Sequence, residues 1–187
     1  MSKARASKRS TKSETAKGNW FPIALFALFA VGCLADARGR YPVERRKSIR
    51  FQVEEDNELY ADAKLAAEQW AKATGIDVTV TPDGDVPIVI VEELSADCTP
   101  RAELLACSYI GETPEQGWTE VSRHLDPKLR QISILRQMGH HLRGSLEHAS
   151  EPDTLMSATG ERRLSTITRK DVAFVCSGRF ECSLPRE

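Results

Sequence analysis

Residues 126–144 read DPKLRQISILRQMGHHLRG and carry the signals for both ends of an α-helix. Asp126 is a residue type whose side chain caps the first free N–H groups of a helix, and Pro127 suits the first helical position because it has no N–H. Gly144 is suited to end the helix because it adopts a positive φ angle without steric cost. The stretch therefore predicts a helix from Pro127 to about Leu142.

Upstream of this helix, the sequence predicts a strand followed by a longer helix. Apolar residues alternate over residues 49–53, which is typical of a half-buried strand. They then recur at steps of four and three over residues 59–73, which is the spacing of one helix face. Asn57 is placed to cap this helix and Gly75 to end it.

Four further strands are predicted between the two helices. Residues 76–80 alternate, whereas residues 86–91 are almost continuously apolar and predict a strand that is buried on both faces. Pro87 should lie at the start of that strand, because proline donates no hydrogen bond to a sheet. Two short strands follow at residues 108–113 and 118–125.

The last part of the chain completes the fold class. Residues 145–167 show no regular period and predict an irregular segment. Thr168 and Asp171 have the spacing of a capping box and predict a helix near residues 169–176. The expected fold is α+β, with one twisted mixed sheet of about five strands and three helices in a single domain over residues 48–187.

The N-terminal part has the composition of an export signal. Residues 1–19 hold six Lys or Arg and one Glu, a net charge of +5, ahead of an uncharged apolar run at residues 20–32. This run is too short to cross a bilayer, which takes about 20 residues, and it fits a secretory signal peptide. We expect residues 1–37 to form this basic head and signal peptide, and residues 38–47 a charged leader.

Three outcomes for the signal follow from its flanking residues. Ala30-Val31-Gly32-Cys33 resembles a bacterial lipobox, in which Cys33 becomes the lipidated first residue. Ala35-Asp36-Ala37 fits an ordinary signal peptidase site instead, and an uncleaved membrane anchor is the third alternative. Each outcome exports the domain to the cell envelope or the extracellular space, with membrane contact only through an N-terminal anchor.

The charge of the exported part argues against nucleic acid as a partner. Because the whole chain carries a net charge of −1, residues 34–187 carry −6. An acidic body lacks the basic face that displaces counterions from phosphates.

Four cysteines are left for disulfides once Cys33 is lipidated or removed. Eight residues separate Cys98 from Cys107, and five separate Cys176 from Cys182. In an oxidising compartment, the simplest of the three pairings joins each cysteine to its near neighbour. Neither pair has the C-x-x-C spacing of a zinc site.

The most specific motif lies at the end of the 126–144 stretch and in the loop after it. Residues 136–148 read RQMGHHLRGSLEH, and residues 151–158 read EPDTLMSA. They resemble the zinc-dependent metzincin proteases, most closely the bacterial matrixin-like branch, in which H-E-x-x-H-x-x-G-x-x-H precedes a turn that contains methionine. Met156 matches that turn, and the order of predicted elements matches over residues 48–176. The resemblance implies a metzincin-like domain.

Compared with that motif, the catalytic residues are incomplete. Arg136 stands at the first His position, and its guanidinium has no lone pair for a metal. Gln137 stands at the position of the catalytic Glu, and an amide cannot take the proton of a metal-bound water. His140 matches the second His. Leu146 occupies the third His position, and a two-residue insertion would bring His148 there instead.

The resemblance therefore implies a non-catalytic pseudoprotease that binds a peptide or protein in the former cleft and needs no cofactor. Peptides bind such folds as an added strand, and the resemblance places the exposed edge strand near residues 108–113. The alternative is a divergent zinc-dependent metallopeptidase that hydrolyses peptide bonds. It would hold zinc with His140, His148 and a third ligand, for which the candidates are His124, His141 and Glu147. A structural envelope lipoprotein is a third hypothesis.

Simpler interpretations of the same residues stay open. His140 and His141 also fit a solvated helix face, and His148 beside Glu147 fits a surface ion pair or a loop position. Met156 is a core residue under either interpretation.

Arg136 also has a structural interpretation. It would fill the volume left by the metal if it paired with a carboxylate such as Glu147. On this hypothesis, Arg136→His alone does not create zinc binding unless the loop of residues 144–148 also re-forms.

Overall fold

The computed structural model describes residues 45–95, 105–158 and 165–183 of the chain. Internal contacts divide the chain into residues 1–42 and residues 43–187, and the described ranges all belong to the second unit. The predicted signal peptide, the lipobox at Cys33 and the start of the leader lie outside the described residues. None of the described helices is long and apolar enough to cross a membrane.

The described residues form five strands, three α-helices and one 3-10 turn, as the sequence predicted for the strands and α-helices. Their order along the chain is β1 (Ser48–Gln52), α2 (Tyr60–Thr74), β2 (Asp77–Thr81), β3 (Val86–Val91), β4 (Ala106–Tyr109), η2 (Pro114–Gln116), β5 (Trp118–Ser122), α3 (Pro127–Arg143) and α4 (Arg169–Cys176). The largest difference is at β4, which begins two residues before the predicted strand and ends four residues before its end.

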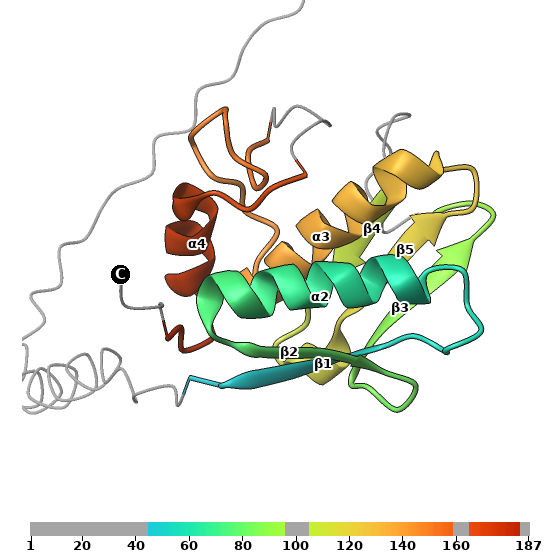
Figure 1. The fold of residues 1–187 in the computed structure, drawn as a ribbon, viewed down its shortest axis with the longest axis horizontal. Coiled ribbons are helices and arrows are strands. Elements are labelled where there is room, and N and C mark those ends of the chain that lie inside the picture. The colour runs from blue at the N-terminus through green and yellow to red at the C-terminus, as the bar shows by residue number, and fades with distance from the viewer. Residues whose placement is uncertain (1–44, 96–104, 159–164, 184–187) are drawn as a thin grey trace, which may run out of the picture. The chain divides into compact units, whose positions relative to one another are not determined.

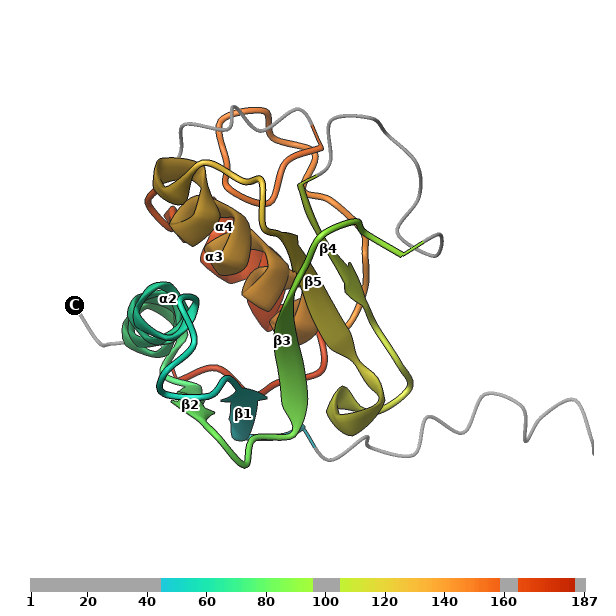
Figure 2. The same ribbon diagram turned by 90° about the vertical axis from the view of Figure 1, so that its right-hand side faces the viewer.

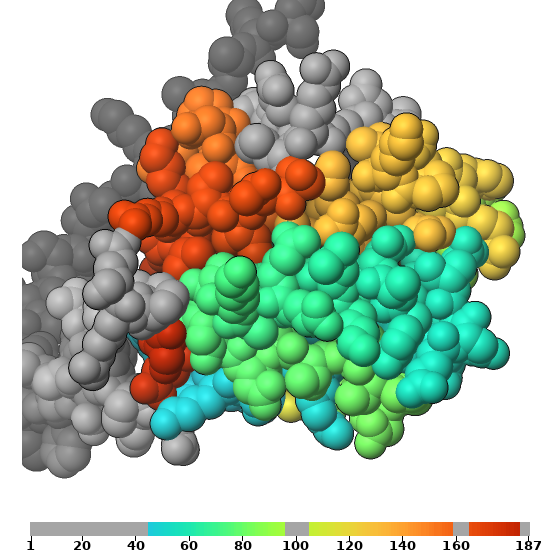
Figure 3. All heavy atoms as spheres, in the orientation of Figure 1, coloured from blue at the N-terminus to red at the C-terminus, as the bar shows by residue number. Residues whose placement is uncertain are grey.

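One mixed sheet carries all five strands, in the order β2-β1-β3-β5-β4. The strands β2, β1, β3 and β5 pair in parallel, and β4 pairs antiparallel with β5 at one edge. Helices α2 and α3 lie on the same side of this sheet (Figures 1 and 2). Figure 3 shows α2 as the outer cover of that side, with α3 and the loop after it above. The fold class is therefore α+β.

The core lies between the sheet and the two long helices. Ile49 and Phe51 of β1 point into it and are buried, as the alternating pattern predicted. Trp70 of α2 is fully buried, and its Nε1–H donates to the carbonyl oxygen of Leu135 in α3 at 2.7 Å. This hydrogen bond connects the two helices and satisfies the N–H of a buried indole ring.

The prediction that residues 86–91 are buried on both faces was wrong. Val86 and Ile88 are buried against the helices, but Val89 is 40 % exposed on the opposite face. The reason is that helices cover only one face of the sheet (Figure 2). A continuous apolar run in sequence does not show which face is covered.

The predicted helix ends agree with the structure at four of five positions. Asp126 accepts a hydrogen bond from the backbone N–H of Lys128 at 2.8 Å, and Gly144 ends α3 with a φ of 76°. Gly75 ends α2 with a φ of 69°, and the capping box at the start of α4 is formed. Asn57 is not the residue that caps α2. The helix begins at Tyr60, and the Asn57 side chain accepts a hydrogen bond from the N–H of Leu59, which lies just before the helix.

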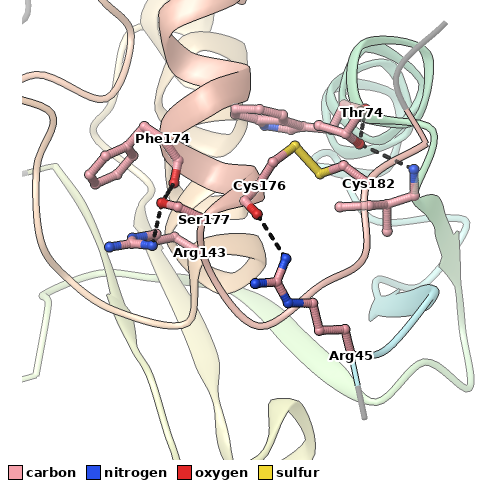
Figure 4. The surroundings of a disulfide bond; sticks show 9 residues. Arg45, Thr74, Arg143, Phe174, Cys176, Ser177 and Cys182 are labelled. Carbon is pink, nitrogen blue, oxygen red and sulfur yellow. Dashed lines mark hydrogen bonds between the residues drawn. A yellow bond between two sulfur atoms is a disulfide. The ribbon is translucent and has the colours of Figure 1, made fainter. Parts of the chain in front are cut away.

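A disulfide joins Cys176 at the end of α4 to Cys182, as predicted, with a Cα–Cα distance of 5.6 Å (Figure 4). The segment after α4 then reaches α2, where the N–H of Ser183 donates to the carbonyl of Thr74. Cys107 is also disulfide-bonded. Its predicted partner Cys98 lies outside the described residues, so that pairing stays a prediction.

The helices α2 and α3 and the loop at Met156 meet closely at Gly139. A Cβ atom at this position would lie 2.5 Å from Sδ of Met156 and 2.8 Å from Cζ2 of Trp70. Both distances are shorter than van der Waals contact, so only glycine fits without a shift of a fully buried side chain.

We therefore expect Gly139→Ala to destabilise the fold, although alanine favours helix more than glycine does. Overpacking should lower the free energy of unfolding by about 1–3 kcal/mol, as measured by urea denaturation. Ser133→Ala in the same helix is the matched control, because it changes helix propensity without this contact. A variant Gly139→Ala as stable as the control would contradict the packing described.

Candidate functional site

The helix α3 and the loop after it bring the resemblance-derived residues together. Arg136 and His140 are four residues apart on α3 and therefore lie on one helix face. The loop returns so that the rings of His140 and His148 meet edge to face, with 5.2 Å between their centroids. The next residue holds this loop in place, because the N–H of Ala149 donates to the carbonyl of Met156 at 2.9 Å. The loop after α3 therefore brings His148 into contact with His140 of the helix.

The solvated-face interpretation of His140 was wrong. The residue is 3 % exposed, and its Nδ1 lies 3.1 Å from the carbonyl oxygen of Ser145. Because a carbonyl only accepts, Nδ1 carries the proton and Nε2 keeps its lone pair in the neutral ring. Burial lowers the pKa of His140 to about 4. The charges of Arg136 and His148 lower it further, whereas the hydrogen bond to Ser145 raises it.

His141 was also expected on a solvated face, but it is 2 % exposed and faces the sheet. Its Nε2 lies 3.0 Å from Oγ1 of Thr119, which in turn lies 2.7 Å from Oγ of Ser108. The edge of its ring meets Phe51. Desolvation by burial, and to a smaller extent the charge of His140, lowers its pKa to about 3. His141 is therefore a core residue that ties α3 to β4 and β5.

Arg136 does not pair with Glu147, contrary to the hypothesis from the sequence. Its Nη1 donates to the carbonyl oxygen of Leu155 at 3.0 Å. Glu147 is bound instead by Nη2 of Arg143 at 3.2 Å, four residues away on the helix side of the loop. Burial lowers the pKa of the Arg136 guanidinium, and the charge of Asp171 acts in the opposite direction.

Gln137 lies beside the edge strand of the sheet. It is 9 % exposed, and its Nε2 donates to the carbonyl oxygen of Ala106 at 3.4 Å. The amide therefore spans from α3 to β4, which is a contact that an acceptor-only carboxylate cannot make.

Met156 is fully buried under this cluster, as both interpretations of the sequence required. Its backbone N–H donates to Oδ1 of Asp171 at 2.8 Å, while Oδ2 of Asp171 accepts from the N–H and the hydroxyl of Thr168. Asp171 is fully buried and thus links the start of α4 to the loop at Met156. The sequence indicated only its capping role, because Met156 and Asp171 are 15 residues apart in sequence.

The donor set does not fit the three-ligand zinc site that the resemblance implies. His140 and His148 are the only pair from the predicted ligands that the described residues bring together. His124 is exposed and lies 3.6 Å from Glu92, and His141 and Glu147 are used as described above. No group of three or more His, Cys, Asp or Glu close enough to hold a metal occurs in the described ranges. At the remaining ligand position, Arg136 offers N–H donors and no lone pair.

No protein-family model matches the chain, and a search of curated proteins finds no match.

The buried imidazoles predict that the fold loses stability in mild acid. Both have pKa values below the ordinary 6.5, so between pH 6.5 and about 4 the unfolded chain binds protons that the folded chain does not. The two histidines therefore do not lower the free energy of unfolding above pH 6.5. As the pH falls to 4, each lowers the free energy of unfolding by on the order of 3 kcal/mol.

Urea denaturation at a series of pH values measures this loss, and His141→Gln should make the loss smaller. The comparison uses the difference between neutral and acidic pH for each protein, so the packing cost of the substitution cancels. An equal loss in the variant and the wild type would show that His141 does not contribute.

Proposed function

We propose that this protein is an exported pseudoprotease of metzincin-like fold that binds a peptide or an extended protein segment along strand β4. One observation carries the proposal: Arg136 and Gln137 stand where the resemblance places a metal ligand and a catalytic base, and Gln137 contacts the edge strand β4. The site thus keeps a place for a peptide and lacks two groups needed for hydrolysis.

The architecture supports the metzincin-like part of the proposal. The long helix α2 follows the first strand, α3 carries the motif residues, and a buried methionine lies beneath them before the last helix. This is the order that the resemblance implies over residues 48–176. The disulfide at Cys176 supports export, since such bonds persist in oxidising compartments. Lipidation at Cys33 remains part of the proposal.

The hydrolytic reaction fails on the chemistry of the two substituted side chains. A water can be activated by a metal whose ligands have lone pairs and by a base that takes its proton. A guanidinium stays protonated and repels a cation, and a neutral amide has no basic oxygen at neutral pH. Two such changes in adjacent residues remove both requirements at once.

The strand β4 offers a backbone edge to a ligand. The N–H of Ser122 donates to the carbonyl of Leu105 at 2.7 Å, and the register continues through Cys107 with Glu120. Antiparallel pairs alternate between bonded and non-bonded residues, so Ala106 and Ser108 turn their backbone groups to the open edge. Gln137 already bonds the carbonyl of Ala106 from this side. An added peptide strand would pair with the backbone groups of Ser108.

Replacement of Ser108 tests this mode of binding. Ser108→Pro removes the outward N–H without removing a hydrogen bond to β5, because Ser108 is a non-bonded position in that pair. Its matched control is Ser108→Ala, which loses the same side-chain bond to Thr119 but keeps the N–H. Peptides selected from a random display library on the full wild-type chain supply the ligand, and fluorescence polarisation measures its affinity.

We expect Ser108→Ala to retain binding and Ser108→Pro to weaken it by about tenfold, since one net backbone hydrogen bond contributes about 1 kcal/mol and its loss leaves a partner unpaired. Equal affinity of the two variants, both folded by circular dichroism, would contradict strand addition at β4. Failure of the library to yield any peptide that competes at this edge would contradict peptide binding itself.

A second candidate function, a divergent zinc peptidase, is favoured by the geometry of His140 alone. An imidazole that donates Nδ1–H to a backbone carbonyl, with Nε2 left as an acceptor, has the arrangement of many metal-ligating histidines. The ring of His148 lies against it. This candidate requires zinc in the wild-type protein, which the pseudoprotease does not.

Metal content separates the two candidates. We expect the full wild-type chain, purified without chelator and dialysed after zinc addition, to hold little zinc by mass spectrometry. Because the loop already brings His148 to His140, Arg136→His should supply a third imidazole and raise the content to about one zinc per chain. The control Arg136→Gln removes the same charge without adding a ligand. About one zinc in the wild type, lost in His140→Ala, would favour the peptidase.

A further inference from the structure

The guanidinium of Arg136 has a large unused hydrogen-bonding capacity. It carries five N–H donors, and one of them, on Nη1, is used by the carbonyl oxygen of Leu155. The atoms Nε and Nη2 form the opposite edge of the group and make no hydrogen bond to the described residues. Neither atom is fully enclosed, because the enclosed side-chain atoms without a partner in the described part of the chain are Thr81 Oγ1 and Arg143 Nε.

Arg136 lacks the direct carboxylate pair that most described arginines have. Carboxylates pair with Arg46, Arg50, Arg123, Arg130 and Arg143. Arg45 bonds only the carbonyl of Cys176, but it is exposed to solvent. Arg179 bonds only carbonyls, but one of them belongs to Gly144, at the C-terminal end of α3 where the helix dipole is negative. Arg136 lies in the interior of α3, is half-buried and forms no ion pair within the described ranges.

The nearest carboxylate does not complete the pair. Asp171 acts on Arg136 through space, but its two oxygens already accept from the N–H of Met156 and from the N–H and hydroxyl of Thr168. The imidazoles of His140 and His148 provide no negative charge. Asp171 therefore supplies a negative charge at a distance but no hydrogen bond to the guanidinium. A carboxylate from outside the chain would add the charge-assisted hydrogen bonds that Asp171 does not make.

We infer that Arg136 is an anion-recognition residue that takes the terminal carboxylate of the bound peptide on its Nε–Nη2 edge. This edge presents two parallel N–H groups, which match the two oxygens of a carboxylate. The residue next to it in sequence, Gln137, contacts β4, so the proposal places the end of the peptide where α3 meets that strand. His140 supplies an acceptor at Nε2 for a donor group of the same ligand.

This inference rests on the peptide binding proposed above and narrows its ligand to peptides that end at this site. It also accounts for Arg rather than a neutral residue at position 136. A neutral side chain would remove the metal as effectively, whereas a guanidinium with a free edge adds a specific carboxylate contact.

The test compares a selected peptide with a free C-terminal carboxylate and the same peptide with a C-terminal amide, on the full chain. A third form carries the amide and a Glu side chain at the last position, to separate a terminal carboxylate from a side-chain one. We expect the free carboxylate to bind at least about tenfold more tightly than the plain amide, because a hydrogen bond to a charged group contributes more than a neutral one. We also expect the Glu form to bind more weakly than the free carboxylate.

Substitutions assign the effect to Arg136. Arg136→Gln should remove the preference for the carboxylate, and Arg136→Lys should retain part of it as a point charge without the paired N–H groups. Arg50→Gln is the charge-matched control, because Arg50 lies on the exposed face of β1 and pairs with Asp85. Circular dichroism and unfolding midpoints show that the variants are folded, and Arg136→Lys keeps the test valid if Arg136→Gln does not fold.

Two readouts distinguish a failure of this inference from a failure of peptide binding. Equal affinity of the carboxylate and amide peptides, or an unchanged preference in Arg136→Gln, would overturn the role of Arg136 and leave strand pairing intact. A preference for the Glu form over the free terminus would overturn the assignment to a chain end.

Sodium acetate, titrated while the Arg136 Nε–H resonance is followed by NMR, tests the anion site without any peptide. A shift of that resonance supports the anion site, even where no peptide pairs with β4.

Discussion

The position of the whole site depends on the close approach of α2, α3 and the Met156 loop at Gly139. The absence of a side chain there lets Met156 and Trp70 lie within van der Waals distance of the α3 backbone. The indole of Trp70 then bonds the carbonyl of Leu135 one turn earlier. Because His140 is the next residue on α3, this packing determines where its ring lies relative to the loop that carries His148.

Buried polar contacts extend this packing to the rest of the domain. Asp171 holds the N–H of Met156 and the start of α4 together, and His141 connects α3 with Thr119 of β5. Each contact satisfies groups that would otherwise be buried without partners, which is the condition for polar residues in a core. The same packing leaves the guanidinium of Arg136 with one hydrogen bond, to a backbone carbonyl, and without a direct ion pair in the described part of the chain.

Local sequence rules were sufficient for most of the secondary structure. The cap at Asp126, the positive φ of Gly75 and Gly144, and the capping box at Thr168 depend on residues within one helical turn, so they can be predicted without the fold. The errors arose where a neighbour decides the outcome. Val89 is exposed because the sheet is covered on one side only. His141 is buried against Thr119 and Phe51, which are far away in sequence, and His140 is covered by the loop that follows α3.

The sequence by itself determined the order of the elements, the residue types Arg and Gln at positions 136 and 137, and the cysteine pair at the C-terminal end. These properties follow from residue identity and short-range spacing. The tertiary structure alone decided that His148 returns to His140, that Glu147 binds Arg143 and not Arg136, and that Gln137 reaches the carbonyl of Ala106. The physical reason is that a loop has many conformations of similar local energy, and tertiary contacts such as the one between Ala149 and Met156 select one of them.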